Sequence, residues 1–140
     1  MKVTLRKADL EKMIAHAEAN LPEEACGLIA GVDREDGVRE IRKVYLCENT
    51  DHTDEHFSIS PETQLKAVRD MRAGGMSPLG NWHSHPASPS RSSQEDIRLA
   101  SYNPKASYLI LSLMDRANPV IHSFHVEDGT STAEDLEIGE

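Results

Sequence analysis

The seven residues Tyr-Leu-Ile-Leu-Ser-Leu-Met at positions 108–114 constrain the fold more than any other part of the sequence. Apolar side chains occupy both alternating sets of positions, which is typical of a strand buried on both faces of a sheet. After a turn at 115–118, residues 119–126 alternate in hydrophobicity, as expected for a strand that pairs with the first. The sequence therefore predicts a central strand and a hairpin partner.

Hydrophobic periodicity and turn residues predict the remaining elements. They are a strand at 3–6, an amphipathic helix at 8–21, a β-hairpin at 24–47, a loop at 48–55, a short strand at 56–60, a helix from Pro61 to the glycines at 74 and 75, a strand at 78–85 and a helix that starts at Ser93. In the helix after Pro61, Leu65, Val68 and Met71 mark the expected buried stripe. Before the last helix, Ser92 and Glu95 have the spacing of a capping box.

These elements predict one domain of the α/β (α+β) class at residues 1–128. A chain of 140 residues is long enough for a single hydrophobic core. Residues 129–140 are mostly polar and acidic, and we expect them to form a flexible C-terminal tail.

The net charge of −9 argues against nucleic acids or anionic membranes as partners, because both require a basic surface. No apolar run reaches the length of a membrane span, and the N-terminus lacks the apolar core of a signal peptide. We therefore expect a cytoplasmic protein. Cys26 and Cys47 are then expected to be free thiols, although a disulfide between them stays open.

His83, His85 and Asp96 form a candidate metal site. Residues i and i+2 of a strand point to the same face, so the two histidines project side by side. Ser93 and Asp96 share a face in the first turn of the following helix. Three protein ligands leave a fourth tetrahedral position open, which is typical of a catalytic zinc rather than a structural one.

Glu24 is the candidate general base and acid, because a carboxylate is unusual at the start of an apolar strand. Ser93 is a poor zinc ligand but is well placed to donate a hydrogen bond to an oxyanion. Each pattern alone has a simpler interpretation: a His-x-His pair is more often exposed surface, and Ser-x-x-Asp is usually a helix cap. Their combination with an upstream glutamate favours a hydrolytic metal site.

The chain resembles the JAMM/MPN+ (Mov34/PAD-1-like) zinc metalloproteases. The resemblance rests on Glu24, on His83-Ser84-His85-Pro86 and on the Ser-x-x-Asp of Ser93 and Asp96, and it extends to the segment Pro-Glu-Glu-Ala-Cys-Gly-Leu at 22–28. It implies a cytidine-deaminase-like MPN fold, a curved mixed β-sheet flanked by helices. It also implies that His83, His85 and Asp96 bind one Zn²⁺ ion, that Glu24 is the general acid/base and that Ser93 stabilises the oxyanion. Ser92 departs from the proline that many relatives carry there.

Chain length suggests a branch of this family. Eukaryotic members carry long insertions that hold ubiquitin, and a chain of 140 residues has no room for them. The sequence is more similar to short prokaryotic members that cleave after the C-terminal Gly-Gly of a ubiquitin-like sulfur-carrier protein, releasing cysteine or a C-terminal extension. Two alternatives remain: removal of a ubiquitin-like modifier from lysine, and a non-catalytic MPN scaffold. A homodimer also stays open.

Overall fold

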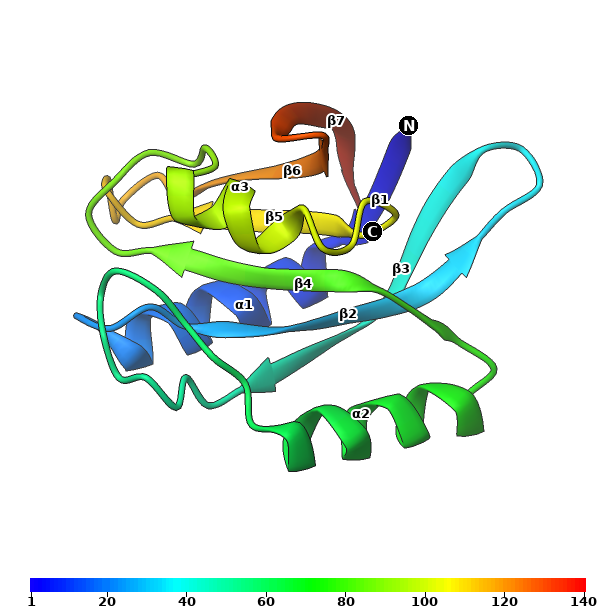
Figure 1. Ribbon diagram of the computed structural model, residues 1–140, viewed down its shortest axis with the longest axis horizontal. Helices are drawn as coiled ribbons and strands as arrows, with labels where there is room; N and C mark the ends of the chain where they lie inside the picture. Colours follow the sequence, from blue (N-terminus) through cyan, green and yellow to red (C-terminus); the bar gives the residue numbers. More distant parts are fainter.

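The computed structural model describes all residues, 1–140, as seven strands and three helices (Figure 1). They follow the order β1 (Lys2–Arg6), α1 (Lys7–Asn20), β2 (Cys26–Asp33), β3 (Val38–Cys47), α2 (Pro61–Ala73), β4 (Ser77–His85), α3 (Gln94–Ala100), β5 (Ser107–Ser112), β6 (Val120–Glu127) and β7 (Thr130–Gly139). None of the helices has the length and hydrophobicity that a membrane span requires.

The strands form one mixed sheet that closes on itself in the order β1-β3-β2-β4-β5-β6-β7. β4 runs antiparallel to β2 and parallel to β5, and His83 is paired with a residue of each neighbour. β5 lies between β4 and its hairpin partner β6. Its residues Leu109, Ile110 and Leu111 have no solvent exposure, which confirms the predicted central strand. The predicted class, a curved mixed sheet with helices on its faces, is confirmed as well.

The two faces of the sheet bury different helices. Met13 and Ala17 of α1 belong to the main hydrophobic core, together with Trp82 of β4. Figure 1 shows α1 behind β2 and β4, whereas α3 lies in front beside β5. Because side chains alternate along a strand, His83 and His85 face away from the core that Trp82 joins. The candidate metal ligands thus lie on the side of the sheet opposite α1.

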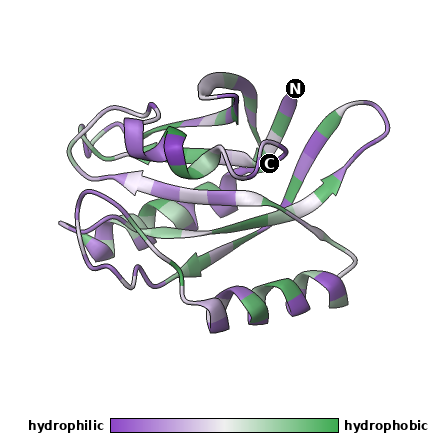
Figure 2. Ribbon diagram, in the orientation of Figure 1, coloured by the Kyte–Doolittle hydropathy of each residue, from purple (hydrophilic) through white to green (hydrophobic).

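The helix α2 begins as predicted, and two of the three residues of its expected buried stripe, Val68 and Met71, pack against the sheet. Ser60 caps it by accepting a hydrogen bond from the Thr63 N–H at 3.1 Å. Hydrophobic and hydrophilic residues alternate along α2 (Figure 2), yet Leu65 is 52% exposed. Ala67, which was not predicted, and Met71 pack on Ala30 of β2. The expectation that Leu65 is buried was wrong, because the helix packs Ala67 on the sheet and leaves Leu65 facing solvent.

The expectation of a flexible tail at 129–140 was also wrong. The acidic segment forms β7, which pairs in parallel with all of β1 and antiparallel with β6 at residues 123–127. Leu136 packs against the main core. The two neighbouring strands thus order a segment whose composition indicated a solvated end, and the domain extends beyond residue 128.

Residues 56–60, predicted as a short strand, belong to no strand. The backbone of Ser58 is held instead by two residues at the start of the same loop: its N–H donates to Asn49 Oδ1 at 3.2 Å, and its carbonyl accepts from Thr50 N at 2.9 Å. The loop therefore folds back on its own beginning and makes no sheet ladder.

Candidate metal centre

The register of β2 and β4 sets the position of Glu24. Cys26 is the residue of β2 that pairs with His83 of β4. The strand β2 begins at Cys26, so Glu24 precedes the strand and does not open it as expected. Continuing the same register by two residues brings Glu24 opposite His85. The sheet thus directs the glutamate toward the histidine pair.

The predicted ligands His83, His85 and Asp96 converge, and their donor atoms all lie within 4.8 Å of one another. The Nε2 atoms of the two histidines are 3.1 Å apart. Asp96 lies against both: its Oδ1 is 3.3 Å from His83 Nε2, and its Oδ2 is 3.2 Å from His85 Nε2. Two imidazole nitrogens and a carboxylate directed at one point are a donor set suited to a transition-metal ion.

A hydrogen bond orients the imidazole of His85, and a stacked ring supports that of His83. His85 Nδ1 is 2.9 Å from the carbonyl oxygen of Pro89. A carbonyl can only accept, so Nδ1 donates to it, and Nε2 is the ring nitrogen that faces Asp96 and can bind a metal ion once it has lost its proton. The ring of Phe57 stacks on His83 with 4.9 Å between centroids and 23° between planes. The Nδ1 atom of His83 is buried without a hydrogen-bond partner.

Asp96 is fixed by the start of α3. The N-cap of this helix is Ser93, whose Oγ accepts from Asp96 N at 3.0 Å while Ser93 N donates to Asp96 Oδ2 at 2.9 Å. The capping box therefore joins Ser93 and Asp96, one residue later than the predicted pair of Ser92 and Glu95. Burial opposes ionisation of Asp96, but the hydrogen bonds with His83 and His85 outweigh it and hold its pKa well below the usual range.

Glu24 is only 3% exposed, and its Oε1 has no hydrogen-bond partner. Burial raises the pKa of Glu24 to about 8; the nearby His85 counteracts this rise, and Asp96 adds to it. A buried carboxyl with a pKa near neutrality can accept and return a proton at physiological pH. Its unpartnered oxygen and the adjacent nitrogen and oxygen donors fit a metal ion that carries an exchangeable ligand.

A cavity of about 90 Å³ adjoins this group. His83 and Asp96 form part of its wall, and most of the remaining wall is apolar, from Phe57, Leu99, Ala100, Tyr108, Ile110 and Val126. Leu99 at its rim is 43% exposed. The candidate reaction centre is therefore bordered on one side by an apolar wall.

The structure brings together the predicted ligands and also shows residues that the sequence did not single out. Asn49, part of the predicted loop at 48–55, is only 2% exposed. Phe57 was predicted only as part of a strand. Their contacts with the candidate site, from Asn49 to the Glu24 carbonyl and from Phe57 to the His83 ring, span 25 residues or more and leave no local signal.

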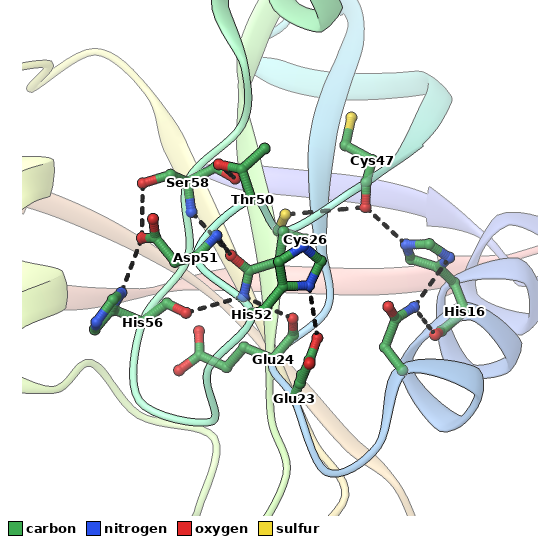
Figure 3. Close-up of polar contacts among 12 residues, drawn as sticks. His16, Glu23, Glu24, Cys26, Cys47, Thr50, Asp51, His52, His56 and Ser58 are labelled. Carbon is green, nitrogen blue, oxygen red and sulfur yellow. Dashed lines mark hydrogen bonds and ion pairs between the residues drawn. The ribbon is translucent and has the colours of Figure 1, made fainter.

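The other histidines and the cysteines stay outside the group. His52 and His56 are on the exposed loop beside Glu24, paired with Glu23 and Asp51 respectively (Figure 3). Cys26 and Cys47 are free and buried, as expected. Burial raises the pKa of Cys26 to about 12, so its thiol stays protonated and unreactive at neutral pH.

The order and arrangement of these elements define a domain of the JAB1/MPN type. The chain superimposes on a JAB1/MPN domain protein from Archaeoglobus fulgidus over the full length of both, with a TM-score of 0.60 at 20% identity. The sequence model of a protein family, the prokaryotic homologs of the JAB domain, matches residues 6–126. The chain belongs to this family.

Closer relatives cover nearly the whole chain. A protein from Desulfitobacterium hafniense, known from its solution structure, has a TM-score of 0.89 at 46% identity over 99% of this chain and 93% of its own. Proteins named CysO-cysteine peptidase in Mycobacterium tuberculosis and Mycobacterium bovis are 32% identical over 139 residues, which is 99% of this chain and 92% of theirs.

Proposed function

We propose that this protein is a zinc-dependent peptidase that hydrolyses the bond after the C-terminal Gly-Gly of a ubiquitin-like sulfur-carrier protein, releasing cysteine or a C-terminal extension. The observation that carries the proposal is the convergence of His83, His85 and Asp96 beside the buried, unpartnered carboxyl of Glu24. Membership of the prokaryotic JAB family and the name of the mycobacterial relatives support the choice of substrate.

His83 Nε2, His85 Nε2 and the Asp96 carboxylate would hold the zinc ion. When bound, zinc would supply Lewis-acid chemistry, which lowers the pKa of a water ligand to roughly 7 and polarises a carbonyl group. The Pro89 carbonyl orients His85, and the Ser93 N–H orients Asp96. Zinc ligands are generally held by hydrogen bonds of this kind to residues that do not touch the metal.

Glu24 moves the proton in this reaction. One oxygen of its carboxylate accepts a proton from the attacking water, and the resulting carboxylic acid delivers it to the nitrogen of the leaving amine. A pKa of about 8 suits both steps, because neither protonation state is strongly favoured near neutral pH.

Ser93 stabilises the substrate carbonyl oxygen as negative charge develops on it. Its Oγ already accepts the Asp96 N–H, so the hydroxyl proton remains available for donation. Loss of a donor of this kind typically costs about 100- to 1000-fold in kcat.

The test uses a sulfur-carrier protein expressed with one cysteine after its terminal Gly-Gly. Zinc-loaded wild-type protein is expected to shorten this carrier by one residue, measured by mass spectrometry, and to lose activity on treatment with a chelator. Glu24→Gln is expected to bind zinc normally and to lose at least about 100-fold in kcat. Glu23→Gln is the matched control, because Glu23 is the neighbouring acid but pairs with the exposed His52.

Equal activity of Glu24→Gln and wild type would refute the mechanism. A second arm presents the same carrier joined to a lysine side chain. Preferential cleavage of that conjugate would assign the enzyme to modifier removal instead, and a zinc-free protein that cleaves neither conjugate would be a scaffold.

A further inference from the structure

Asn49 is a buried amide with every hydrogen-bonding position in use. Its Nδ2 group donates to the carbonyl oxygens of Glu24 and His56, both at 3.0 Å. Its Oδ1 accepts from Asp51 N at 3.0 Å and from Ser58 N at 3.2 Å. The side chain is only 2% exposed and makes two donor and two acceptor contacts, so four hydrogen bonds hold it in one orientation.

Only an asparagine-type side chain can make this set of contacts. Two of its partners are carbonyl oxygens, which require a donor, and the other two are N–H groups, which require an acceptor. Aspartate has the same shape but offers no donor when ionised, and alanine offers neither. The pattern of partners therefore also fixes which way the amide points.

The first segment that Asn49 binds is the backbone of Glu24. Because Glu24 precedes β2, the sheet ladder does not hold it. Its carbonyl accepts from Asn49, and its N–H donates to the carbonyl of Thr53 at 2.8 Å. Both polar backbone groups of Glu24 are thus bound by the loop at 49–58, whose position beside Glu24 is visible in Figure 3.

The second segment that Asn49 binds is the backbone on either side of Phe57. Asn49 holds the carbonyl of His56 and the N–H of Ser58, the residues immediately before and after it. The Phe57 ring in turn stacks on the His83 imidazole and lines the apolar cavity. One amide therefore connects the segment that carries the glutamate with the segment that packs against a predicted zinc ligand.

We propose that Asn49 is a positioning residue that sets Glu24 and Phe57 relative to the His83 imidazole. The inference rests on the proposed function for its catalytic consequence. Asn49 does not touch the reacting atoms; it acts through the two backbone segments that it joins. Its loss leaves the zinc ligands in place and displaces the proton-transfer group and the ring that supports His83.

The experiment compares Asn49→Asp with the wild type as zinc-loaded proteins and with Thr50→Val as the matched control. Thr50 is the adjacent loop residue; its hydroxyl donates only to the Ser58 carbonyl, which keeps the Thr50 N–H bond in the variant. With the cysteine-extended carrier, Asn49→Asp is expected to lose about 10- to 100-fold in kcat, as misplaced groups do. Its KM should stay within about threefold and its zinc content should be unchanged.

A second readout is independent of activity. In the metal-free protein, proton NMR reports the ring-current shift that Phe57 imposes on the His83 ring protons. This shift is expected to be lost in Asn49→Asp and retained in Thr50→Val. If Asn49→Asp does not fold, Asn49→Ser takes its place in both measurements.

Three results would overturn the proposal: wild-type kcat in the folded Asn49 variant, an equal loss in Thr50→Val, or a loss that follows the zinc content. A wild-type enzyme that cleaves no carrier would refute the proposed function instead. The ring-current comparison would then decide the positioning role alone, and an unchanged His83 spectrum would refute it.

Discussion

Ser84 and Ala25 are joined by two hydrogen bonds: Ser84 N donates to the Ala25 carbonyl at 2.9 Å, and Ala25 N donates to Ser84 Oγ at 2.8 Å. Ser84 lies between the two candidate ligand histidines, and Ala25 follows Glu24 directly. This side-chain contact extends the pairing of the two segments beyond the end of the regular ladder. It holds the glutamate segment against the histidine strand, whereas Asn49 binds the same segment to the loop at 49–58.

Ser84→Ala removes the acceptor and leaves the buried Ala25 N–H without a partner. We expect a loss of about 1–3 kcal/mol in the free energy of unfolding, together with a lower kcat as Glu24 becomes less fixed. Urea unfolding and carrier cleavage measure the two effects. Ser123→Ala is the control: Ser123 is equally buried, but its hydroxyl donates to Glu134, away from the metal group. An equal loss of kcat in both variants would contradict the prediction.

Glu24→Gln should stabilise the metal-free protein increasingly as pH rises. The pKa of Glu24 is raised by burial from 4.5 to about 8, so between these values the folded state holds a proton that the unfolded state has released. Wild-type stability therefore falls from about pH 4.5 and levels off above about pH 8. Glutamine does not titrate, so its Tm advantage over wild type should grow by several degrees from pH 5 to pH 8.5. Parallel Tm curves for the two proteins over this range would refute the assignment.

Gly27→Ala should destabilise the domain strongly. A Cβ atom at this position would lie 1.7 Å from the Tyr45 carbonyl oxygen and 2.3 Å from Trp82 Nε1. These two atoms are themselves hydrogen-bonded at 3.0 Å, so neither can move freely. We expect a loss of about 3 kcal/mol or more in denaturant unfolding. Gly139→Ala, with no atom within 4 Å of the new Cβ, should be neutral.

Deletion of residues 130–140 should abolish cooperative folding or lower the Tm by more than about 10 °C. β7 supplies a neighbour to both β1 and β6, and its removal opens the closed sheet and uncovers core residues near Leu136. Removal of Glu140 alone, which lies outside β7, is the control and should have no effect. Thermal unfolding followed by circular dichroism separates a structural strand from a dispensable tail.

Sequence patterns predicted the parts of the molecule whose signals are local. The strand β5 followed from an apolar run on both faces and β6 from alternating hydrophobicity. The convergence of His83, His85 and Asp96 followed from their spacing on a strand end and a helix start. The helix face of α2 was predicted less well: Leu65 and Ala67 lie on different faces of the helix, and which of them is buried depends on which face packs on the sheet.

The parts that were missed depend on distant partners. β7 is rich in charge and polar residues, and it becomes a strand because neighbours on both sides satisfy its backbone. Asn49 begins a polar loop, where asparagine usually only forms turns, and its contact with Glu24 spans 25 residues. No local pattern distinguishes such an amide from an ordinary turn residue.

The strand β4 is paired on both edges, and this separates the position of the candidate metal ligands from the recognition of a substrate. Because β2 and β5 occupy both edges of the strand at His83, no substrate chain can add to the sheet there. A substrate is then recognised through side chains and through the surrounding loops and helix ends, and loops tolerate sequence change far better than a paired strand. Substrate range in such a domain can therefore diverge, or be exchanged by grafting loops, while the candidate metal ligands stay in place.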